Sequence, residues 1–533
     1  MRDVLDALAA LGMPVVGDRL AGGVLVDDDA PGSPGGAALA RGGAHRAQWR
    51  RAAIGADGSV ARVPAIAPAL ARAAAGLGAP ASERGAPPVP LRISHAAARA
   101  LARGHPWVLR DPGCDDALAH RPGALVELRD RERGDRAIAL ALADGDGTCV
   151  ARCLPRGAAG ASIEQRVDAA IARRGALAFP PARATAAART DRGTRTSPAT
   201  RRAPGGGRDA TDAVRLVHGE ADALPGLAID RLGPALRALV VGRAGLGIAR
   251  VALARAAERL EAELGCACVA IEVVHVRAPA AARGAALVQA SVVRGDAAWL
   301  ARDGEGRFEV RERGLAFGVE PGLADPTRAM PGVGLFLDQR DNRERLARFA
   351  RATGGGRWLN LFAHTGAFSV ALLAAGAAEV TSVDLSARYL RWLDDNLARN
   401  RARGVDARRH VAARRDGRRF LEVLGARERF RGIVLDPPTA AAAGRKHWSI
   451  RKDLQPLVEK ALEHLEPGGR LLVCRNDRAR RGPSLGDACE AAARAAGVRL
   501  ARLDAAPPGP DFPSLPGFPE GDPFRGVLLE RAP

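Results

Sequence analysis

Two carboxylates in the last third of the chain each follow a segment that is typical of a buried strand. Asp384 ends the segment EVTSVD, and Asp436 follows FRGIVL and begins the triplet Asp-Pro-Pro. Upstream, Gly366 lies in a turn between the strand-like segment RWLNLF and the apolar, helix-like segment FSVALLAAGA. Because parallel strands end at one edge of a sheet, ligands bind at that edge, and an acidic residue on the second strand accepts ribose hydroxyls. The three positions therefore predict an adenosine-type site.

The turn itself, AHTGA, lacks the G-x-G-x-x-G spacing of dinucleotide-binding loops. Its one glycine, Gly366, is expected to let the backbone pass close to a ligand, and Thr365 is expected to cap the following helix. The free N–H groups at that helix N-terminus suit an anionic or carboxylate ligand. The next helix is expected to have Ser386 as its N-cap, with one apolar face that is formed by Leu390, Leu393 and Leu397.

The Asp-Pro-Pro triplet indicates which ligand the site takes. Pro437 and Pro438 remove two backbone donors and stiffen the turn, which leaves carbonyls and the Asp436 carboxylate free to hold a planar base edge. The segment LEPGGRLLVCRND then predicts a PGG turn and a fifth strand. This combination is expected of nucleic-acid methyltransferases that use S-adenosylmethionine. A nucleotide-dependent oxidoreductase is a less favoured alternative, because such enzymes are not expected to carry this combination.

The net charge of the chain is strongly positive. Lys and Arg number 80 against 60 Asp and Glu, a net charge of +20, which favours a polyanionic partner such as nucleic acid. However, Ala, Gly and Arg dominate throughout, as they do in proteins of GC-rich genomes, and the only lysines are Lys446, Lys452 and Lys460. The charge alone therefore leaves a nucleic-acid partner and a compositional bias equally open.

Cysteine usage and hydropathy exclude several classes of protein. The seven cysteines form neither a C-x-x-C pair nor a His-flanked metal spacing, so no metal site is predicted. The first residues include Asp3 and Asp6 and do not resemble a signal peptide. There is no apolar stretch of the length, about 18 residues, that a membrane span requires. The simplest expectation is a cytoplasmic protein without a membrane span.

The spacing of apolar residues changes along the chain and indicates four segments. Residues 1–88 are mostly Ala, Gly, Pro and Arg and are expected to be largely disordered. The alternation of apolar residues predicts a small β-rich domain over residues 89–157 and a central α+β domain over residues 158–315. Within the latter, 179–211 is rich in Arg, Pro, Gly and Thr and is expected to be a disordered basic insertion. Residues 316–533 alternate strands with longer helices, which predicts an α/β fold with a doubly wound parallel sheet.

Six motifs occur in an order that resembles the bacterial 23S ribosomal-RNA methyltransferases that carry an N-terminal PUA domain. The best known members of this family modify cytosine C5 or guanine N7. The resemblance extends from residue 90 to residue 533, apart from the insertion. The motifs are RGHPWVLRD (103–111), RLVHGEADALPGLAIDRLG (215–233), GLFLDQRDNR (334–343), NLFAHTGAFSV (360–370), DPPT (436–439) and DFPSLPGFPEG (511–521).

The resemblance implies a PUA-like RNA-binding domain at 89–157, a class I methyltransferase domain at 316–533 and S-adenosylmethionine as cofactor. It implies that Asp416, just after the segment ARRHVAA, meets the adenine amine. The family's catalytic turn corresponds to Asp436, Pro437 and Pro438. The cofactor-binding residues that the resemblance implies are Asn360, Phe362, Thr365, Gly366, Asp384, Asp416 and Asp436.

The cysteine pattern bears on which base is modified. Cytosine C5 is a poor nucleophile, so C5 enzymes first attack C6 with a cysteine thiolate. In the resembling C5 enzymes this cysteine lies seven residues after the second glycine of the PGG turn, a position that Asn476 occupies here. Cys474 lies two residues earlier and, by strand alternation, on the same face. Guanine N7 needs no such nucleophile, so N7 is favoured and C5 is the alternative.

The segment after DPPT is basic, as in the guanine-N7 branch that it resembles. His447 or Trp448 is expected either to stack on a splayed base or to pack within the domain. A phosphate-binding role or a solvated charged face is expected of Arg445, Lys446, Arg451 and Lys452. The following helix is expected to begin near Gln455, with Pro456 in its first turn.

The predicted function is methylation of 23S rRNA, with the rRNA or a pre-50S particle as partner. A non-catalytic RNA-binding or ribosome-assembly protein with a degenerate cofactor fold is the alternative from another class. Whether the protein forms a homodimer is left open by the sequence.

Overall fold

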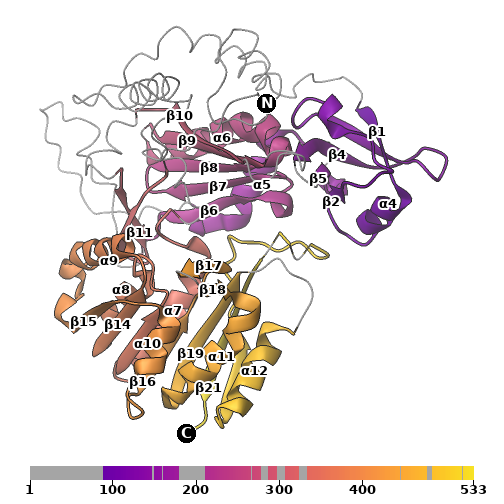
Figure 1. The fold of residues 1–533 in the computed structure, drawn as a ribbon. Helices are drawn as coiled ribbons and strands as arrows, with labels where there is room; N and C mark the ends of the chain where they lie inside the picture. Colours follow the sequence, from indigo (N-terminus) through magenta and orange to yellow (C-terminus); the bar gives the residue numbers. More distant parts are fainter. Residues whose placement is uncertain are drawn as a thin grey trace, which may run out of the picture.

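The structure, a computed structural model, describes residues 88–533 except for the segment 179–209 and several shorter gaps. These gaps are 147–148, 159, 266, 278–285, 297–305, 323–332, 444–445, 477–482, 519 and 522. The disordered segments predicted at 1–88 and 179–211 lie, apart from their last residues, outside the described chain. Figure 1 shows three bodies in that chain, each built around its own sheet. No helix among the described residues is both long and apolar enough to cross a membrane.

The first body is a five-stranded sheet of order β1-β3-β4-β5-β2, drawn in indigo in Figure 1. β1 runs parallel to β3, and the other neighbours are antiparallel. β3 alternates between buried and half-buried residues, as its apolar-polar alternation predicts. One helix, α4 (His95–Ala102), begins after the N-cap Ser94. The strands are β1 (Val89–Ile93), β2 (Trp107–Leu109), β3 (Leu125–Asp130), β4 (Arg136–Asp146) and β5 (Cys149–Cys153).

The second body is a five-stranded sheet of order β10-β9-β8-β7-β6 with two helices. The longer helix, α6 (Gly242–Leu264), connects the parallel strands β8 and β9, and its apolar face shares a core with α5 (Ile163–Arg174). This parallel crossover needs a helix because the chain must return to the starting edge of the sheet. The strands are β6 (Ala213–His218), β7 (Leu227–Leu232), β8 (Ala235–Val241), β9 (Val269–Arg277) and β10 (Ala286–Arg294).

The third body is a seven-stranded sheet of order β15-β14-β13-β16-β19-β21-β20, in which only β21 is antiparallel to its neighbours. The strand order reverses between β13 and β16, and such a switch point places a ligand crevice at the carboxyl ends of the strands. The strands are β13 (Arg357–Leu361), β14 (Glu379–Asp384), β15 (His410–Arg414), β16 (Phe430–Leu435), β19 (Leu465–Asn476), β20 (Leu500–Ala505) and β21 (Phe524–Arg531). Two hairpins flank the sheet, β11 (Phe308–Glu312) with β12 (Leu315–Val319) and β17 (Ala440–Ala443) with β18 (Lys446–Ser449).

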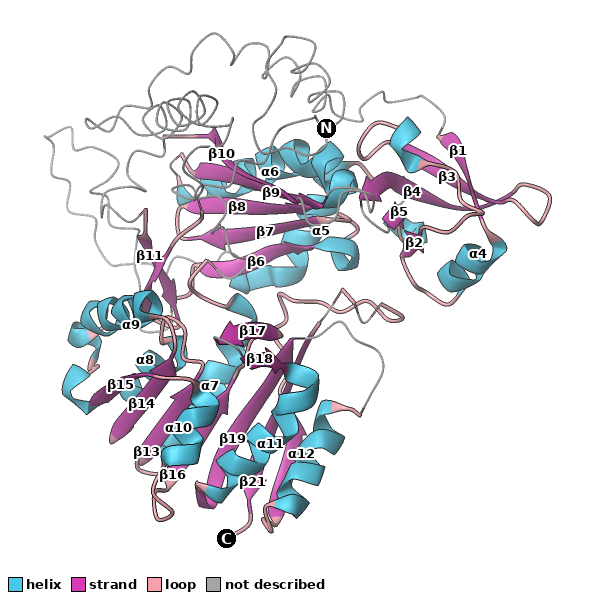
Figure 2. Cartoon of the chain, in the orientation of Figure 1, coloured by secondary structure: helices cyan, strands magenta, loops and turns pink. Residues whose placement is uncertain are grey.

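Helices cover both faces of this sheet, and each face has its own apolar core. Figure 2 shows the second group of helices over the near face of the sheet. The first group is α7 (Arg340–Ala352), α8 (Ala367–Ala374) and α9 (Ala387–Arg399), and the second is α10 (Gly417–Val423), α11 (Ile450–Glu463) and α12 (Leu485–Ala495). The predicted doubly wound α/β fold is confirmed for this body.

The start of α9 is confirmed and that of α11 is corrected. The hydroxyl of Ser386 accepts the N–H of Tyr389 as an N-cap, and the three predicted leucines of α9 are buried. In contrast, α11 begins at Ile450, six residues before Pro456, which therefore lies inside the helix. Apolar packing of the first turn explains the difference, because the buried side chains of Ile450 and Leu454 join the same core as the rest of the helix.

A buried aspartate in the C-terminal motif joins the second and third bodies. Asp511 is fully buried, and its carboxylate accepts hydrogen bonds from the Arg340 guanidinium and, at 3.1 Å, from the backbone N–H of Arg215. Its carbonyl accepts another from Arg174 at 2.9 Å. Arg340 belongs to α7, whereas Arg215 and Arg174 belong to β6 and α5. Removing the carboxylate would therefore leave the buried cation of Arg340 without this partner, whereas Arg174 and Arg215 would keep their pairs with Asp222 and Asp230.

The same C-terminal motif also contacts the first body. The ring of Phe518 lies 4.7 Å from that of Trp107 and 5.5 Å from that of His105, both measured between centroids. Trp107 in turn donates its indole N–H to Glu220 of the second body, at 2.7 Å. Three motifs that are remote in sequence, at 103–111, 215–233 and 511–521, thus meet in space.

Candidate active site

The turn after β13 adopts a strained backbone. Phe362 and His364 have φ angles of 59° and 51°, in the left-handed region that non-glycine residues rarely enter. Thr365 does not cap α8, contrary to the prediction, because its hydroxyl donates to the carbonyl of Gly334 instead. The helix has Gly366 at its N-cap and no side-chain cap. The turn is therefore fixed by the segment before α7 and keeps the first N–H groups of α8 without a side-chain acceptor.

Gly366 is needed for packing against α9. Its φ is 76°, and a Cβ at this position would lie 2.2 Å from Cγ of Leu393. The close approach of α9 is a second reason for glycine here, and the predicted close approach of the backbone to a ligand stays a prediction. Any larger residue would separate the turn from α9.

Asp384 lies at the end of β14 beside this turn, as predicted. Its Oδ2 accepts the N–H of His364 and its Oδ1 accepts the N–H of Ser386, both at 2.8 Å. Burial raises the pKa of this carboxyl above its usual value, and backbone hydrogen bonds from Ser386, His364 and Leu385 oppose that shift. Since each carboxylate oxygen can accept two hydrogen bonds, this carboxylate keeps acceptor capacity for a diol.

Asn360 is placed differently from the prediction. Its side chain is buried beneath the turn, and its amide donates to the hydroxyl of Ser369 at 2.9 Å. That hydroxyl is 2.7 Å from the hydroxyl of Ser382, so the three side chains link β13, α8 and β14. The Asn360 amide is therefore engaged within the fold, where the prediction assigned it to the cofactor.

Asp416 follows β15 and caps α10. Its carboxylate accepts the backbone N–H groups of Arg418 and Arg419 and pairs with the Arg418 guanidinium. Burial alone would raise the pKa of Asp416, but the hydrogen bonds from Arg418 and Arg419 lower it below the usual value. The Arg418 guanidinium lies 5.6 Å from the ring centroid of Trp448, which in turn lies 5.9 Å from that of Phe362. Asp416 is thus connected through Arg418 and Trp448 to the turn after β13.

Trp448 packs within the domain, which is one of its two predicted roles. Its side chain is buried, and its indole N–H donates to the carbonyl of Pro438 at 2.6 Å. It is therefore not free to stack on an RNA base, whereas the Pro438 carbonyl, which can accept a second hydrogen bond, keeps its predicted contact with a base edge as a prediction. Arg451 and Lys452 are exposed on the first turn of α11. The side chains of Arg445, Lys446 and His447 lie outside the described residues, so their predicted RNA contacts stay predictions.

Asp436 follows β16 at the switch point of the sheet. Its Oδ2 accepts a hydrogen bond from Nε2 of Gln339 at 2.8 Å. Burial, and after it the negative charge of Asp338, raise the pKa of Asp436 to about 7, although the Gln339 hydrogen bond and the charge of Arg343 act in the opposite direction. The carboxyl is therefore poised between its acid and its ionised form near neutral pH. Pro437 beside it is buried and Pro438 is exposed.

Cys474 is fully buried within β19. Its sulfur accepts the second N–H of Gln339 Nε2, at 3.2 Å. Burial, and after it the negative charge of Asp436, raise the pKa of this thiol well above its ordinary value. A thiolate is the reactive form of cysteine. Cys474 is thus a core thiol, whereas Asn476, at the family position of the nucleophile, is exposed.

The sequence prediction missed Gln339. The motif GLFLDQRDNR is one of the six that carry the family resemblance, but nothing in its sequence marks Gln339 as a site residue. A buried glutamine that contacts Asp436 from 97 residues away leaves no local signal except its place in that motif.

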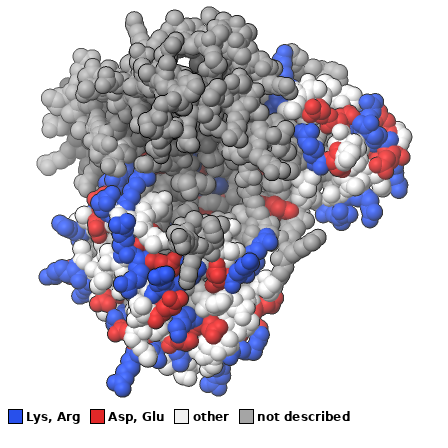
Figure 3. Space-filling view, viewed as in Figure 1, with Lys and Arg blue, Asp and Glu red and all other residues white. Residues whose placement is uncertain are grey.

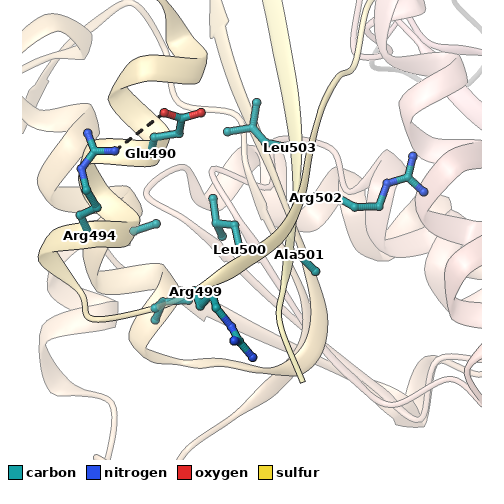
Figure 4. Close-up of a pocket in the computed structure, with 9 residues that line it drawn as sticks. Glu490, Arg494, Arg499, Leu500, Ala501, Arg502 and Leu503 are labelled. Atoms are coloured by element: carbon teal, nitrogen blue, oxygen red, sulfur yellow. Dashed lines mark ion pairs between the residues drawn. The ribbon is translucent and has the colours of Figure 1, made fainter.

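One surface cavity lies away from the ends of β13 and β16. The cavity in Figure 4 has a volume of about 370 Å³ and lies between α12 and β20, remote in the sheet order from β13 and β16. Arg494 and Glu490 form an ion pair on its rim. In the described part of the chain, no group of three or more side chains is arranged to hold a metal ion.

The chain is similar to known methyltransferases, both in sequence and in fold. A family model described as S-adenosylmethionine-dependent methyltransferase matches residues 246–522. A ribosomal RNA large subunit methyltransferase of Deinococcus radiodurans is 30% identical over 459 residues, which are 85% of this chain and 100% of that protein. A ribosomal RNA large subunit methyltransferase K/L of Allochromatium vinosum is 38% identical over 176 residues, which are 32% of this chain and 22% of that protein.

Two solved structures share the fold. SMU.776, described as a methyltransferase and crystallised with SAH, superposes with a TM-score of 0.59 at 19% identity. A protein from Streptococcus mutans that is described as S-adenosylmethionine-dependent gives a TM-score of 0.56 at 18% identity. Each comparison covers 83% of this chain and 100% of the other. With a family match over more than half of its length and a relative that is matched from end to end, this chain belongs to the S-adenosylmethionine-dependent methyltransferases.

Proposed function

We propose that this methyltransferase modifies 23S ribosomal RNA at N7 of a guanine. The curated relative that it matches along its whole length is named as a large-subunit rRNA methyltransferase. The observation that carries the choice of base is the pairing of a poised carboxyl, Asp436, with a thiol, Cys474, that is buried and bonded to Gln339. Cytosine C5 methylation requires a free thiolate beside the base. Guanine N7 methylation requires none.

The described residues fit an S-adenosyl ligand. The remaining acceptor capacity of Asp384 suits the two ribose hydroxyls. Asp416 follows β15, the strand beside β14, where it would meet the adenine amine. The first N–H groups of α8 have no side-chain acceptor and suit a carboxylate. In the reaction, the N7 lone pair bonds to the methyl carbon as the carbon–sulfur bond breaks, and the sulfur keeps the bonding electrons.

Asp436 would act electrostatically. Methylation at N7 leaves a positive charge on the imidazole ring of guanine, and no proton is transferred. An ionised carboxylate at the end of β16 would stabilise this charge as it develops, and its effect is larger at a partly buried site than in water. The rigid turn of Pro437 and Pro438 would limit where the base can lie.

RNA binding would involve surfaces outside the crevice. We infer that residues 89–157 form a PUA-like RNA-binding domain and that residues 158–315 help to orient the RNA. A third surface, here called the arginine edge, lies beside β15. Arginine makes up nine of the 21 residues from 399 to 419, against about one residue in seven in the whole chain. Its exposed members are Arg401, Arg408, Arg409, Arg414, Arg415 and Arg419.

The arginine edge has little compensating charge within its own segment. Asp406 pairs with Arg408 and lies 3.9 Å from Arg409, whereas Asp416 pairs with Arg418. Figure 3 shows Lys and Arg side chains gathered on the left of the third body, over α9 and β15. The fraction of arginine in this segment is about three times that of the whole chain. The GC-rich composition alone does not explain such a concentration, which supports an RNA contact.

The experiment that tests the proposal is methyl transfer in vitro. Purified protein is incubated with S-adenosylmethionine that carries a labelled methyl group and with unmodified 23S rRNA or a pre-50S particle. The RNA is then digested to nucleosides and analysed by mass spectrometry. Labelled 7-methylguanosine is expected. Labelled 5-methylcytidine, or no labelled nucleoside from any rRNA substrate, would overturn the proposal.

A further inference from the structure

Two buried amides connect Asp436 to the backbone just after β20. Nδ2 of Asn342 donates to the carbonyl of Ala506 at 3.2 Å and to Oε1 of Gln339 at 2.9 Å. Nε2 of Gln339 donates to Oδ2 of Asp436 at 2.8 Å. Gln339 is 2% exposed and Asn342 is 1% exposed. We call Asn342 and Gln339 the amide relay.

The two ends fix the direction of the amide relay. A backbone carbonyl can only accept, so Asn342 must turn its N–H group toward Ala506. An ionised carboxylate also only accepts, so Gln339 must turn its N–H group toward Asp436 and its oxygen toward Asn342. Each amide therefore has one orientation that satisfies all of its neighbours. A protonated Asp436 would lose part of this match, because its own O–H would need an acceptor.

We propose that Gln339 is a positioning residue for methyl transfer, which holds Asp436 Oδ2 so that the ionised carboxylate presents Oδ1 to the target base. This inference rests on the proposed function, in which Asp436 stabilises charge on the base. It assigns to the motif GLFLDQRDNR a role in the chemistry of the third body. Gln339 acts only through Asp436 and touches neither cofactor nor base.

The charges around Asp436 explain why its ionised form needs the hydrogen bond from Gln339. Asp338, on the same short segment as Gln339, opposes ionisation, and Arg343 of α7 favours it. From β19, Cys474 contributes a neutral thiol. The guanidinium of Arg343 is also bound to Glu312, through two hydrogen bonds of 2.6 Å, so its charge is already compensated. Gln339 is then the one neutral side chain of the described site that donates directly to this carboxylate.

The test replaces Gln339 by a side chain of similar size without donors. For Gln339→Met, the expected result is a fall in kcat of roughly 10- to 100-fold and a rise of about one unit in the pH of half-maximal activity. SAH binding by calorimetry is expected to stay within about twofold, because the amide relay does not contact the cofactor turn. The carboxyl resonance of Asp436, assigned with Asp436→Asn in the cofactor-free protein, is expected to titrate at correspondingly higher pH.

A second variant and a matched control separate positioning from folding. Asn342→Leu should move the pH profile in the same direction by less, and the double variant should match Gln339→Met, since both act along one path. Asn400 is also a fully buried amide, bonded to the carbonyls of Ala316 and Asn396. Asn400→Leu should lower the unfolding temperature without moving the pH profile.

The outcomes distinguish this inference from the proposed function. If the unaltered protein methylates rRNA and Gln339→Met keeps both its pH profile and the Asp436 titration, Gln339 is structural only and the inference is wrong. If the unaltered protein methylates no RNA but Gln339→Met still moves the Asp436 titration, the contact is real and the proposed function has failed.

Discussion

The amide of Gln339 and the carboxylate of Asp436 lie 97 residues apart in the sequence and 2.8 Å apart in space. Gln339 lies directly before α7, outside the seven-stranded sheet, whereas Asp436 ends its fourth strand in chain order. The contact brings a segment that precedes the sheet onto the switch point of that sheet. The Asp-Pro-Pro turn is therefore contacted by a motif that precedes the sheet in the sequence and continues into α7.

The ionisation of Asp436 predicts opposite pH effects on activity and on stability. Its pKa in the folded protein is raised to about 7, so activity that needs the ionised form should rise with pH through about 7. Because the folded pKa lies above the usual value of 3.8, its contribution to stability is full below pH 3.8 and is lost as the pH rises through 7. Asp436→Asn cannot ionise and should have the higher unfolding temperature at pH 8.

The same variant should bind SAH normally and transfer methyl groups at least about 100-fold more slowly. Calorimetry, methyl-transfer rates and thermal unfolding at pH 5 and pH 8 measure the three quantities. An Asp436→Asn protein that is less stable than the unaltered protein at pH 8, or that keeps its activity, would contradict this assignment.

Asp384 should govern cofactor affinity. Asp384→Ala removes the acceptors proposed for two hydroxyls, and a hydrogen bond to a charged group contributes about 1.5–3 kcal/mol, so SAH affinity should fall at least about 100-fold. Asp406, whose carboxylate pairs with Arg408 at the other end of β15, offers a control. Asp406→Ala should leave SAH affinity unchanged. Equal affinities for the two variants would remove Asp384 from the cofactor site.

Cys474 should be dispensable for methylation. Cys474→Ser keeps an acceptor for Gln339 in a buried position and should retain activity within about threefold, at a cost of about 1–2 kcal/mol in the free energy of unfolding. Nucleoside analysis and denaturant unfolding measure the two effects. Complete loss of methylation in a folded Cys474→Ser protein would identify Cys474 as a nucleophile and favour cytosine C5.

Asp511 should matter for stability more than for chemistry. Asp511→Ala leaves the buried cation of Arg340 without its carboxylate, and breaking a buried pair costs about 3–5 kcal/mol. The free energy of unfolding should fall by that amount, as measured with denaturant. As a control, Asp504→Ala removes a carboxylate that pairs with Arg502 on the surface, and it should cost less than about 1 kcal/mol. Similar losses for the two variants would contradict the proposed joint between the second and third bodies.

The arginine edge should contribute to RNA affinity in proportion to its charge. Replacing Arg401, Arg414 and Arg415 by glutamine should weaken rRNA binding and reduce the slope of log affinity against log salt by about two units, since each phosphate contact contributes about 0.7. The three arginines at the cavity of Figure 4 form a matched control, in which the same replacement should leave the slope unchanged. They are Arg494, Arg499 and Arg502. Equal slopes for the two triple variants would mean that β15 only protects a sheet edge with charge.

Local sequence patterns predicted the strands and the edge where Asp384 and Asp436 lie, because strand alternation and the order of β and α segments depend on neighbours in the chain. They failed where a distant segment decides the environment. The hydroxyl of Thr365, expected to cap α8, donates instead to the carbonyl of Gly334, which is 31 residues away. Gln339 was missed for the same reason. The spacing of apolar residues along a strand or helix does not indicate which distant segment will pack against the end of the sheet.

The most direct test of the account is nucleoside mass spectrometry of 23S rRNA from a strain that lacks this gene, beside its parent. The account predicts that one 7-methylguanosine is lost, and that it returns when the gene or its Cys474→Ser form is supplied but not with Asp436→Asn. Loss of a 5-methylcytidine, restored by the unaltered gene and not by the Cys474→Ser form, would contradict it.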